Sequence, residues 1–544
     1  MISAVRLLPR TGRRLLSSSR LLSSSRPLLN TATGTTSEAL LYPQRAEPPM
    51  LSAHTCEPLK APENLDVPSP ELLRKSEAKL SSLTISDTAP AEINNVPLHL
   101  PSPNSTPPPP PLTEVTVLPS GLTVASHDSP SHLSTIGVLL AAGSRYEGPL
   151  VPPGSSHLFE LMAMQGTPGL SALDLRQSLD DRGSSASLNS SREQLLMCVD
   201  TLRAEAPHAA GLVADCLLRG ELAEAAIEEC KQVMEFQALD MPNDLLVKEG
   251  LQSAAYGPDQ QLGRAHYAAA ESVPGLTAES CRDYRDRFVT ADNMVLCAAG
   301  MEHERLVGFA HEYFADLPAS SERRPEKVPS EYRGGEFRLQ KEDVTGLTRV
   351  AVAFETGGWH CDDLVPTCVL QVLLGGGDSF SAGGPGKGMY SRLYREVLNR
   401  FYWVEAAEAF TSMHDESGLL GISGASTPAK SADLTLVFLE MFAKLSVQPV
   451  TDEELSRARN MLRCNVLTQL ESRVVLFEDI GRQMLTYGKR SSPEEICEKI
   501  NAVTKEDIMR VAKRCMAKPP SISCVGGDLS KCPTFAQISH LRIQ

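Results

Sequence analysis

The chain has 544 residues, enough for two or three domains that each bury a full core. Its hydrophobic content of 42% is typical of a globular protein, and no run of about 18 apolar residues predicts a membrane span. The net charge of -15 disfavours nucleic acid as a partner and favours basic peptides, although the acidity fits a role in solubility equally well. The thirteen cysteines form no C-x-x-C pair and no metal-ligand spacing, which predicts reduced thiols in an intracellular compartment.

Residues 1–37 contain six arginines and no acidic residue. Placed on a helix, the first four arginines fall on one side, and apolar residues such as Leu8 and Leu15 fall on the other. A secretory signal needs an uninterrupted apolar core, and the arginines interrupt every candidate. We therefore predict a mitochondrial transit peptide over residues 1–37 that is absent from the mature protein.

Residues 38–112 are rich in proline and serine and contain five consecutive prolines, Pro107–Pro111. No helical or strand period is sustained there, so we predict an extended linker. The first globular domain is expected over residues 113–317. Its opening sequence, TEVTVLPSGLTVASHD, predicts two short strands around a Pro-Ser-Gly turn, and STIGVLLAAGSRYE, residues 134–147, predicts a further strand that ends at Gly143.

The segment GSSHLFELMAMQGT predicts a helix that Ser155 or Ser156 can cap and that carries His157 and Glu160 on one face. A histidine at position 161 would complete H-x-x-E-H, the inverted zinc-peptidase motif with two histidine ligands and a glutamate base. The residue there is Leu161, and a catalytic zinc normally needs three protein ligands besides water. We expect no zinc in this chain. The alternative role for His157 is that of a partly buried histidine, hydrogen-bonded to a neighbouring carboxylate.

A second, acidic helix is predicted over Glu221–Gln237. In it, Glu228 and Glu235 are seven residues apart and lie two turns apart on one face. Taken alone, these two glutamates fit a solvated helix face.

The polar stretch over residues 318–337 predicts a linker between two domains, of which the second covers residues 338–544. The sequence after the linker repeats the plan of the first half. Leu347–His360 corresponds to the strand and glycine turn at residues 134–147, and QVLLG, Gln371–Gly375, replaces HLFEL without any metal ligand.

Further start and stop signals support a helix-rich second half. Thr451 and Glu454 predict a capping box, Ser492 with Pro493 predicts another helix start, and residues 522–527 predict a closing strand. The expected fold class is α+β, with two similar α/β-sandwich domains.

The least regular stretch is residues 375–388, where eight of fourteen residues are glycine or proline. Inside a helix each Gly would cost ~1 kcal/mol and each Pro about 3 kcal/mol, so we predict a loop. A phosphate-binding Walker A loop is excluded, because Ser381 and Gly388 stand where that motif needs Gly and Ser or Thr. A peptide-binding loop and a mobile surface loop both remain compatible with the composition.

The sequence GGGDSFSAGGPGKGMYSRLY, which begins at Gly375, closely resembles the glycine-rich loop of the α subunits of mitochondrial processing peptidases. The resemblance extends over roughly residues 113–535, and it departs at Asp378, where that family usually has a small neutral residue. It implies that the loop binds the presequences of imported proteins. The residues implied in substrate binding are Gly375, Gly376, Gly377, Asp378, Ser379, Phe380, Ser381, Ala382, Gly383, Gly384, Pro385, Gly386, Lys387 and Gly388.

The resemblance also implies a degenerate zinc site. Glu235 matches the third zinc ligand of the family's β subunits, and Glu228 matches its acidic neighbour, so His157, Glu160 and both glutamates form a remnant without a catalytic residue. The fold implied is that of the processing peptidases and of the core proteins of respiratory complex III. Zinc is expected in a β-subunit partner, with no cofactor in this chain.

The expected function is that of a non-catalytic subunit that recognises basic presequence peptides and presents them to the β subunit, with complex III subunits as further possible partners. The expected location is the mitochondrial matrix, or the matrix side of the inner membrane within complex III. One alternative is a purely structural core 2 subunit of the cytochrome bc1 complex. Another is a peptidase that is active by itself.

Overall fold

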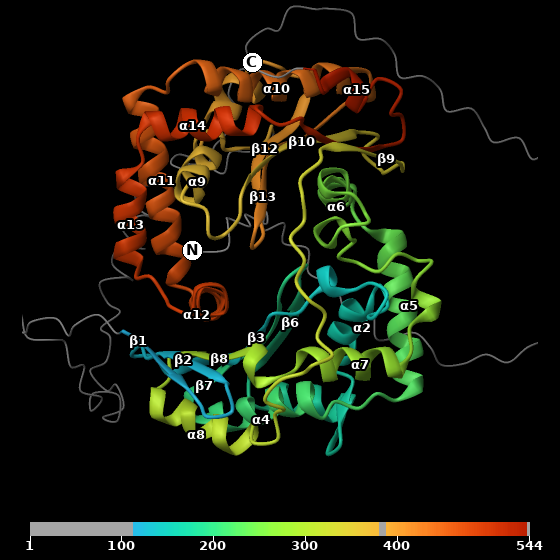
Figure 1. Cartoon of the computed structure of the whole chain (residues 1–544), viewed down its shortest axis with the longest axis vertical. Helices are drawn as coiled ribbons and strands as arrows, with labels where there is room; N and C mark the ends of the chain where they lie inside the picture. The colour runs from blue at the N-terminus through green and yellow to red at the C-terminus, as the bar shows by residue number, and fades with distance from the viewer. Residues whose placement is uncertain (1–111, 380–387, 541–544) are drawn as a thin grey trace, which may run out of the picture. The chain divides into compact units, whose positions relative to one another are not determined.

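The computed structural model describes residues 112–379 and 388–540. The predicted transit peptide and the Pro/Ser-rich linker up to residue 111 lie outside the described residues. The described chain forms two halves, each built on a six-stranded sheet with helices against it (Figure 1). The predicted α+β class is therefore confirmed.

The first sheet has the strand order β1-β2-β8-β3-β7-β6. Strands β2 and β8 are parallel, and the other neighbours are antiparallel. The predicted hairpin around the Pro-Ser-Gly turn is confirmed, because Val117 pairs with Thr123 across it. The strands are β1 (Thr113–Val117), β2 (Thr123–His127), β3 (Leu133–Leu140), β6 (Ser185–Ser190), β7 (Leu195–Leu202) and β8 (Met294–Ala299), and β4 (Gly166–Thr167) with β5 (Leu170–Ser171) forms a separate hairpin.

The α-helices of the first half lie between β3 and β6, between β7 and β8, and after β8. The α-helices are α2 (Ser155–Met162), α3 (Ala172–Asp181), α4 (Ala206–Leu218), α5 (Glu224–Asp240), α6 (Asn243–Tyr256), α7 (Ala278–Phe288) and α8 (His303–Tyr313). Short 3-10 helices are η2 (Ser144–Tyr146), η3 (Arg203–Glu205), η4 (Gln261–Gly263), η5 (Val273–Gly275) and η6 (Ala291–Asn293).

The second sheet repeats the topology of the first and confirms the predicted internal duplication. Its order is β11-β12-β13-β10-β14-β9, in which β14 and β9 are parallel as β8 and β2 are. The series β2-β8-β3-β7-β6 corresponds to β9-β14-β10-β13-β12, and each sheet adds one further edge strand. The strands are β9 (Gly335–Gln340), β10 (Thr348–Gly357), β11 (Gly376–Asp378), β12 (Val404–Met413), β13 (Ser417–Ser426) and β14 (Ser521–Gly526).

The helices of the second half begin largely where the sequence predicts. Thr451 caps α11 and Ser492 caps α13, each in a complete capping box with the glutamate three residues later. The helices are α9 (Leu364–Leu374), α10 (Ser431–Val447), α11 (Asp452–Leu470), α12 (Arg473–Tyr487), α13 (Pro493–Ala502), α14 (Lys505–Met516) and α15 (Phe535–Ile538), with a π-helix η7 (Leu393–Leu398) and a 3-10 helix η8 (Pro428–Lys430).

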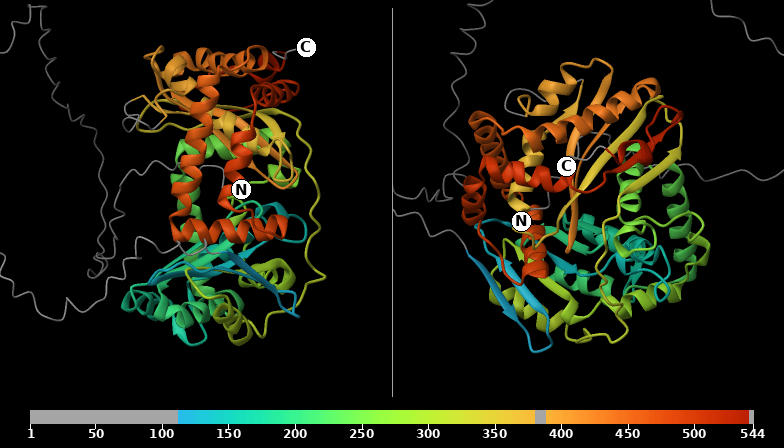
Figure 2. Two further views of the ribbon diagram at one scale, coloured as in Figure 1. Left: turned by 90° about the vertical axis from the view of Figure 1, so that its left-hand side faces the viewer. Right: turned by 45° about the horizontal axis from the view of Figure 1, so that its top comes forward.

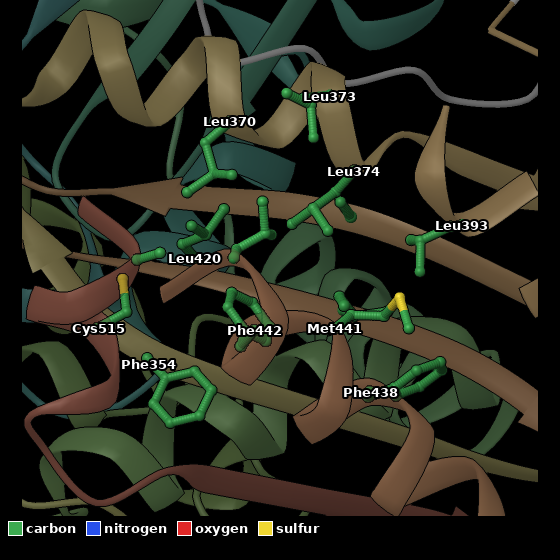
Figure 3. Close-up of a cluster of buried hydrophobic side chains, with 14 of the residues drawn as sticks. Phe354, Leu370, Leu373, Leu374, Leu393, Leu420, Phe438, Met441, Phe442 and Cys515 are labelled. Carbon is green, nitrogen blue, oxygen red and sulfur yellow. The ribbon is translucent and has the colours of Figure 1, made fainter. Parts of the chain in front are cut away.

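The core of the second half positions the glycine-rich segment. Side chains of α9, of the sheet and of α10 gather in one buried cluster, in which Leu370, Leu374 and Phe442 are among those drawn in Figure 3. Helix α9 is buried along most of its length, and its last residue, Leu374, is fully buried. The segment that follows α9 therefore starts from a fixed point.

One helix of each half packs against the sheet of the other half. Helix α12 packs on the first sheet, where Phe477 and Ile480 form a cluster with Leu139 of β3 and Cys297 of β8. Helix α6 packs on the second sheet, where Leu251 belongs to a cluster with strands β10 and β14. The two halves therefore share cores. The segment that connects the two halves, between α8 and β9, follows an extended path along their outer side and is not a β-strand (Figure 2).

One predicted boundary differs in the structure. The last residues of the predicted linker, Gly335 to Phe337, already belong to β9, where they pair with β14. Within the described residues, no single helix combines the length and the apolar composition needed to cross a membrane, although Pro428–Val447 and Asp452–Leu470 meet that requirement jointly across a 110° bend.

Candidate functional site

Helix α2 carries the predicted remnant of the zinc site, and its first turn is held by a buried glutamate. The N-cap is Gly154, at φ 92°, so the prediction that Ser155 or Ser156 caps the helix is wrong. Instead the Glu147 carboxylate accepts hydrogen bonds from the Gly154 and Ser156 amides, each 2.8 Å long, and one of 2.6 Å from the Ser156 hydroxyl. It thereby satisfies two of the N–H groups at the helix start. Burial raises the pKa of Glu147 to about 7.

His157 is buried and makes hydrogen bonds on both ring nitrogens. Its Nδ1 accepts from the Ala268 amide at 3.4 Å, so the proton is on Nε2, which donates to Oε1 of Gln237 at 2.9 Å. The interpretation that His157 bonds to a carboxylate is therefore wrong, because an amide side chain takes that place. Burial lowers the pKa of His157, so the ring stays neutral near pH 7.

Glu160, one turn further along α2, contacts a different neighbour. Its carboxylate accepts from the amide of Ser190 at 3.0 Å and from the Ser190 hydroxyl. Ser190 is the last residue of β6, the edge strand of the first sheet. His157 and Glu160 thus share a helix, but His157 binds α5 while Glu160 binds β6.

Glu228 and Glu235 lie on the exposed face of α5. Glu228 forms a surface ion pair with Lys231 at 2.9 Å. Glu235 precedes Gln237 by two residues, which is about 200° around a helix, so its side chain points away from the side that contacts His157. The alternative of a solvated helix face is confirmed for both. The proposed match of Glu235 to a third ligand is wrong, because Gln237 occupies the place that faces His157.

Leu161 occupies an apolar environment. It packs, partly buried, against a cluster formed by α2, α5 and α7 that includes Ile227 and Met234. Among residues 112–379 and 388–540, no group of three or more His, Cys, Asp or Glu side chains is placed to hold a metal ion. The side chains beside His157 are the amide of Gln237 and the apolar Leu161, where a zinc site needs a carboxylate and a second imidazole, so the residues present do not fit zinc.

The glycine-rich segment leaves α9 through a short strand. Gly375 ends the helix at φ 59°, and Gly376–Asp378 forms β11, which pairs antiparallel with β12 at the sheet edge. The prediction that residues 375–388 form a loop throughout is wrong for these three residues. Backbone hydrogen bonds to β12 hold them in a strand, and such bonds do not depend on side chains. A Cβ on Gly376 would lie 2.0 Å from the Ala407 carbonyl oxygen, so this pairing requires glycine.

The two ends of the glycine-rich loop, here called its stems, are hydrogen-bonded to each other. The first stem is Gly375–Ser379, and the second begins at Gly388. The Gly376 amide donates to the Ser391 hydroxyl at 3.2 Å, and the Tyr394 hydroxyl donates to the Asp378 carbonyl at 3.3 Å. Gly388 starts the second stem, at φ 88°. The loop residues implied in substrate binding that lie outside the described residues are Phe380, Ser381, Ala382, Gly383, Gly384, Pro385, Gly386 and Lys387.

Carboxylates gather beside the first stem. Burial, followed by the negative charges of Glu408 and Asp244, raises the pKa of Asp378. The Ser379 amide donates to the Glu405 carbonyl at 2.8 Å, and the Ser379 hydroxyl lies 3.5 Å from the Glu405 carboxylate. Glu408 forms an ion pair with Lys248 at 2.6 Å, and Asp244 forms one with Arg349, so Asp378 is the carboxylate of this group that a cationic ligand would stabilise.

The candidate site has two parts. One is His157, beside which the described residues supply no further metal-binding side chain, and the other is the glycine-rich segment that begins beside Asp378. The sequence missed Gln237 and Glu147, whose roles depend on the register of α5 and on a turn that precedes α2. Gln237 lies on the acidic helix predicted over Glu221–Gln237, but spacing along that helix does not show which of its side chains faces His157.

Comparisons with known proteins agree on one family. Residues 122–269 match the model described as insulinase (peptidase family M16), and residues 275–462 match the peptidase M16 inactive domain. The chain is 34% identical over 446 residues to a protein named probable mitochondrial-processing peptidase subunit alpha-1 from Arabidopsis thaliana, covering 79% of this chain and 86% of the relative. It is 32% identical over 445 residues to the mitochondrial-processing peptidase subunit alpha of Homo sapiens, covering 78% and 84%.

A structural comparison gives the same fold. A chain from complex III2 of Candida albicans, with Inz-5 bound, superposes with a TM-score of 0.67 at 20% identity, covering 79% of this chain and 99% of that one. At this identity the likeness concerns the fold alone.

Proposed function

The chain belongs to the M16 peptidase family, among relatives that are mitochondrial-processing peptidase α subunits, and we propose that it acts as the non-catalytic subunit of such a peptidase. In this role it binds the basic presequences of imported precursors through the glycine-rich loop and presents them to a zinc-bearing β subunit. The observation that carries the proposal is the pairing of His157 with Gln237 beside Leu161, where a catalytic site needs two more zinc ligands.

Substrate binding is assigned to the loop between Gly375 and Gly388. The anchored stems support this role, because they fix both ends of a segment that otherwise consists largely of glycine and small residues. A glycine-rich backbone lets an extended peptide approach closely. The carboxylates beside Asp378 favour a peptide that carries arginine or lysine.

The cellular setting follows from the relatives and from the amino terminus. The relatives are mitochondrial proteins by name, and residues 1–37 have the composition of a transit peptide. We place the chain in the mitochondrial matrix, or on the matrix side of the inner membrane where it is built into complex III. Its partners in this proposal are a processing-peptidase β subunit, presequence peptides and, in the second location, other complex III subunits.

The test is a deletion of Gly383–Lys387 in a heterodimer reconstituted with a processing-peptidase β subunit. The KM for a presequence peptide should rise at least about tenfold, which corresponds to ~1.4 kcal/mol of lost binding, while kcat changes less. Gly346→Ala, in an exposed turn with no atom within 4 Å of the added Cβ, is the control and should leave KM unchanged. Unaltered KM and kcat in the deletion variant would reject the role of the loop.

A purely structural core 2 subunit of the cytochrome bc1 complex is the second candidate, favoured by the fold shared with the complex III2 chain. In that case the chain would co-purify with complex III, and the loop deletion would leave precursor processing intact. Co-purification together with impaired processing would indicate one chain with both roles.

A further inference from the structure

Helix α5 packs against the first half with one side only. Its buried side chains, Ile227, Cys230 and Met234, join the apolar cluster that also contains residues of α2 and α7. Most of the other residues of the helix are exposed. Figure 1 shows α5 at the edge of the first half, with α2 on its inner side. The opposite side of α5 is therefore accessible to another molecule.

Three large apolar residues form a stripe along this exposed side. Val233, Phe236 and Leu239 are spaced three residues apart, so they follow one another over nearly two turns of the helix. Their exposed fractions are 44%, 65% and 74%. Single exposed apolar residues are ordinary on a protein surface, whereas a contiguous group of them marks an interaction site. The stripe is therefore a candidate docking surface.

A loop of the second half is held at the C-terminal end of the stripe. The Lys341 ammonium donates hydrogen bonds to the carbonyl oxygens of Leu239 at 2.9 Å and of Met241 at 2.8 Å. The same loop carries Val344, whose side chain is fully exposed. The end of α5 is thereby fixed, and a further apolar side chain lies on the loop that fixes it.

The exposed side of α5 is also acidic. The helix contains five acidic residues and one basic residue, Lys231, which already pairs with a neighbouring glutamate at 2.9 Å. Glu229, Glu235 and Asp240 are exposed, as the stripe is. Around the helix axis, Glu229 and Asp240 lie within about 40° of Phe236, and Glu235 lies about 100° away. Carboxylates therefore lie in line with the apolar stripe and along one of its borders.

This combination of an apolar stripe with carboxylates limits the chemistry of the partner. A second copy of the chain would bring acidic residues against acidic residues, and an anionic membrane surface would be repelled for the same reason. A helix with leucine on one face and arginine on another fits both features. Its leucines would cover the stripe, and its arginines would form charge-assisted hydrogen bonds with the carboxylates.

We propose that this side of α5, here called the α5 surface, docks the basic amphipathic helix of a presequence at a second site, apart from the glycine-rich loop. The α5 surface consists of Val233, Phe236, Leu239, Glu229, Glu235 and Asp240. The inference rests on the proposed function, from which it takes the presequence as ligand. Transit peptides are amphipathic, rich in arginine and poor in acidic residues, as the α5 surface requires. The loop and the α5 surface belong to different halves of the chain, so the two sites can be tested separately.

The experiment measures the binding of two fluorescent peptides of about 18 residues to the purified full-length chain. Both peptides contain the same leucine, alanine, serine and arginine residues, and neither contains an acidic residue. In the first peptide leucines and arginines occupy separate faces of a helix, and in the second they are distributed evenly around it. We expect the first peptide to bind more tightly, with a Kd that rises with salt concentration.

Two double variants and a control make the assignment specific. Phe236→Asp with Leu239→Asp should raise the Kd of the first peptide at least about tenfold, because its leucines lose their apolar contact. Glu235→Lys with Asp240→Lys should also weaken binding and reduce its dependence on salt. Leu173→Asp changes a leucine of α3 that is 72% exposed and should leave the Kd unchanged.

A photoreactive group in the leucine face of the first peptide locates the site. The crosslink should fall in the tryptic peptide 232–248, which contains the stripe. It should persist when residues 383–387 are deleted, so a failed role of the loop would leave this proposal standing. Equal binding of the two peptides, an unchanged Kd in Phe236→Asp with Leu239→Asp, or a crosslink confined to the loop would overturn it. If that double variant binds the peptide normally but fails to form the heterodimer, the α5 surface belongs to the subunit interface and the proposal is likewise overturned.

Discussion

Gln237 determines what helix α2 can do. Its amide oxygen accepts a hydrogen bond of 2.9 Å from Nε2 of His157. The nitrogen that would bind a metal therefore already has a hydrogen-bond partner. A carboxylate in place of this amide and a second imidazole in place of Leu161 would supply the three ligands of a zinc site. The two substitutions therefore give an experimental measure of how far the site has diverged.

Leu161→His alone should bind no stoichiometric zinc and cleave no presequence, because His157 would still face an amide. Leu161→His combined with Gln237→Glu should bind more zinc than either single variant, as measured by metal analysis after gel filtration. Glu235→Gln is the matched control, since this exposed glutamate should not alter zinc content. Stoichiometric zinc in the single variant Leu161→His would show that the amide of Gln237 does not prevent zinc binding.

At the scale of residues, the sequence predicted which side chains share a helix but not which residues they contact. The H-x-x-E spacing placed His157 and Glu160 on one helix, as the structure has them. It could not predict that they contact different elements, because the register of α5 against α2 depends on packing among Ile227, Met234 and Leu161. That packing involves residues far apart in the chain.

Among the elements, β11 is one that the sequence analysis assigned to a loop. Three consecutive residues, Gly376 to Asp378, have little intrinsic strand propensity, and only the neighbouring strand β12 makes them a strand. The duplicated sheets, the capping boxes of α11 and α13 and the closing strand were predictable, since each depends on local patterns. β11 depends on tertiary pairing.

Gly376→Ala should detach β11 from β12, because the new Cβ would lie 2.0 Å from the Ala407 carbonyl oxygen and the backbone is at φ 101°. We expect a local cost of at least about 2 kcal/mol. Hydrogen exchange would report it as lost protection of the Ala409 amide, which donates to Gly375. Gly346→Ala shares a positive φ but meets no atom, so it should leave that amide protected. Retained protection in Gly376→Ala would show that β11 does not need glycine.

For the described chain as a whole, the two halves are joined by shared cores and by one buried arginine. Arg145 of the first half is fully buried and binds Glu193 of its own half, the Val328 carbonyl of the connecting segment at 3.1 Å and Glu416 of the second half at 2.8 Å. Burial favours the neutral form of Glu193, but His414, Arg145 and Lys327 lower its pKa to about 2. No local sequence pattern indicates such a junction, since its members come from four distant segments.

Arg145→Met should lower the free energy of unfolding at pH 7 by about 3–5 kcal/mol, because it removes the buried cation that Glu193 and Glu416 share. Arg333→Met, which breaks the exposed pair with Asp259, is the control and should leave the free energy of unfolding nearly unchanged. Because the folded pKa of Glu193 is below its ordinary value, its contribution is present above about pH 4.5 and is lost as pH falls toward 2. Urea unfolding should thus show a smaller difference between wild type and Arg145→Met at pH 3 than at pH 7. An equal difference at both pH values would exclude Glu193 as the linked group.

The most direct measurement is zinc content together with presequence cleavage, made on the isolated chain and on the chain reconstituted with a processing-peptidase β subunit. We expect the isolated chain to contain no stoichiometric zinc and to leave the peptide intact. The reconstituted pair should contain one zinc per heterodimer and cleave the peptide until a chelator is added. Chelator-sensitive cleavage by the isolated chain would contradict the account.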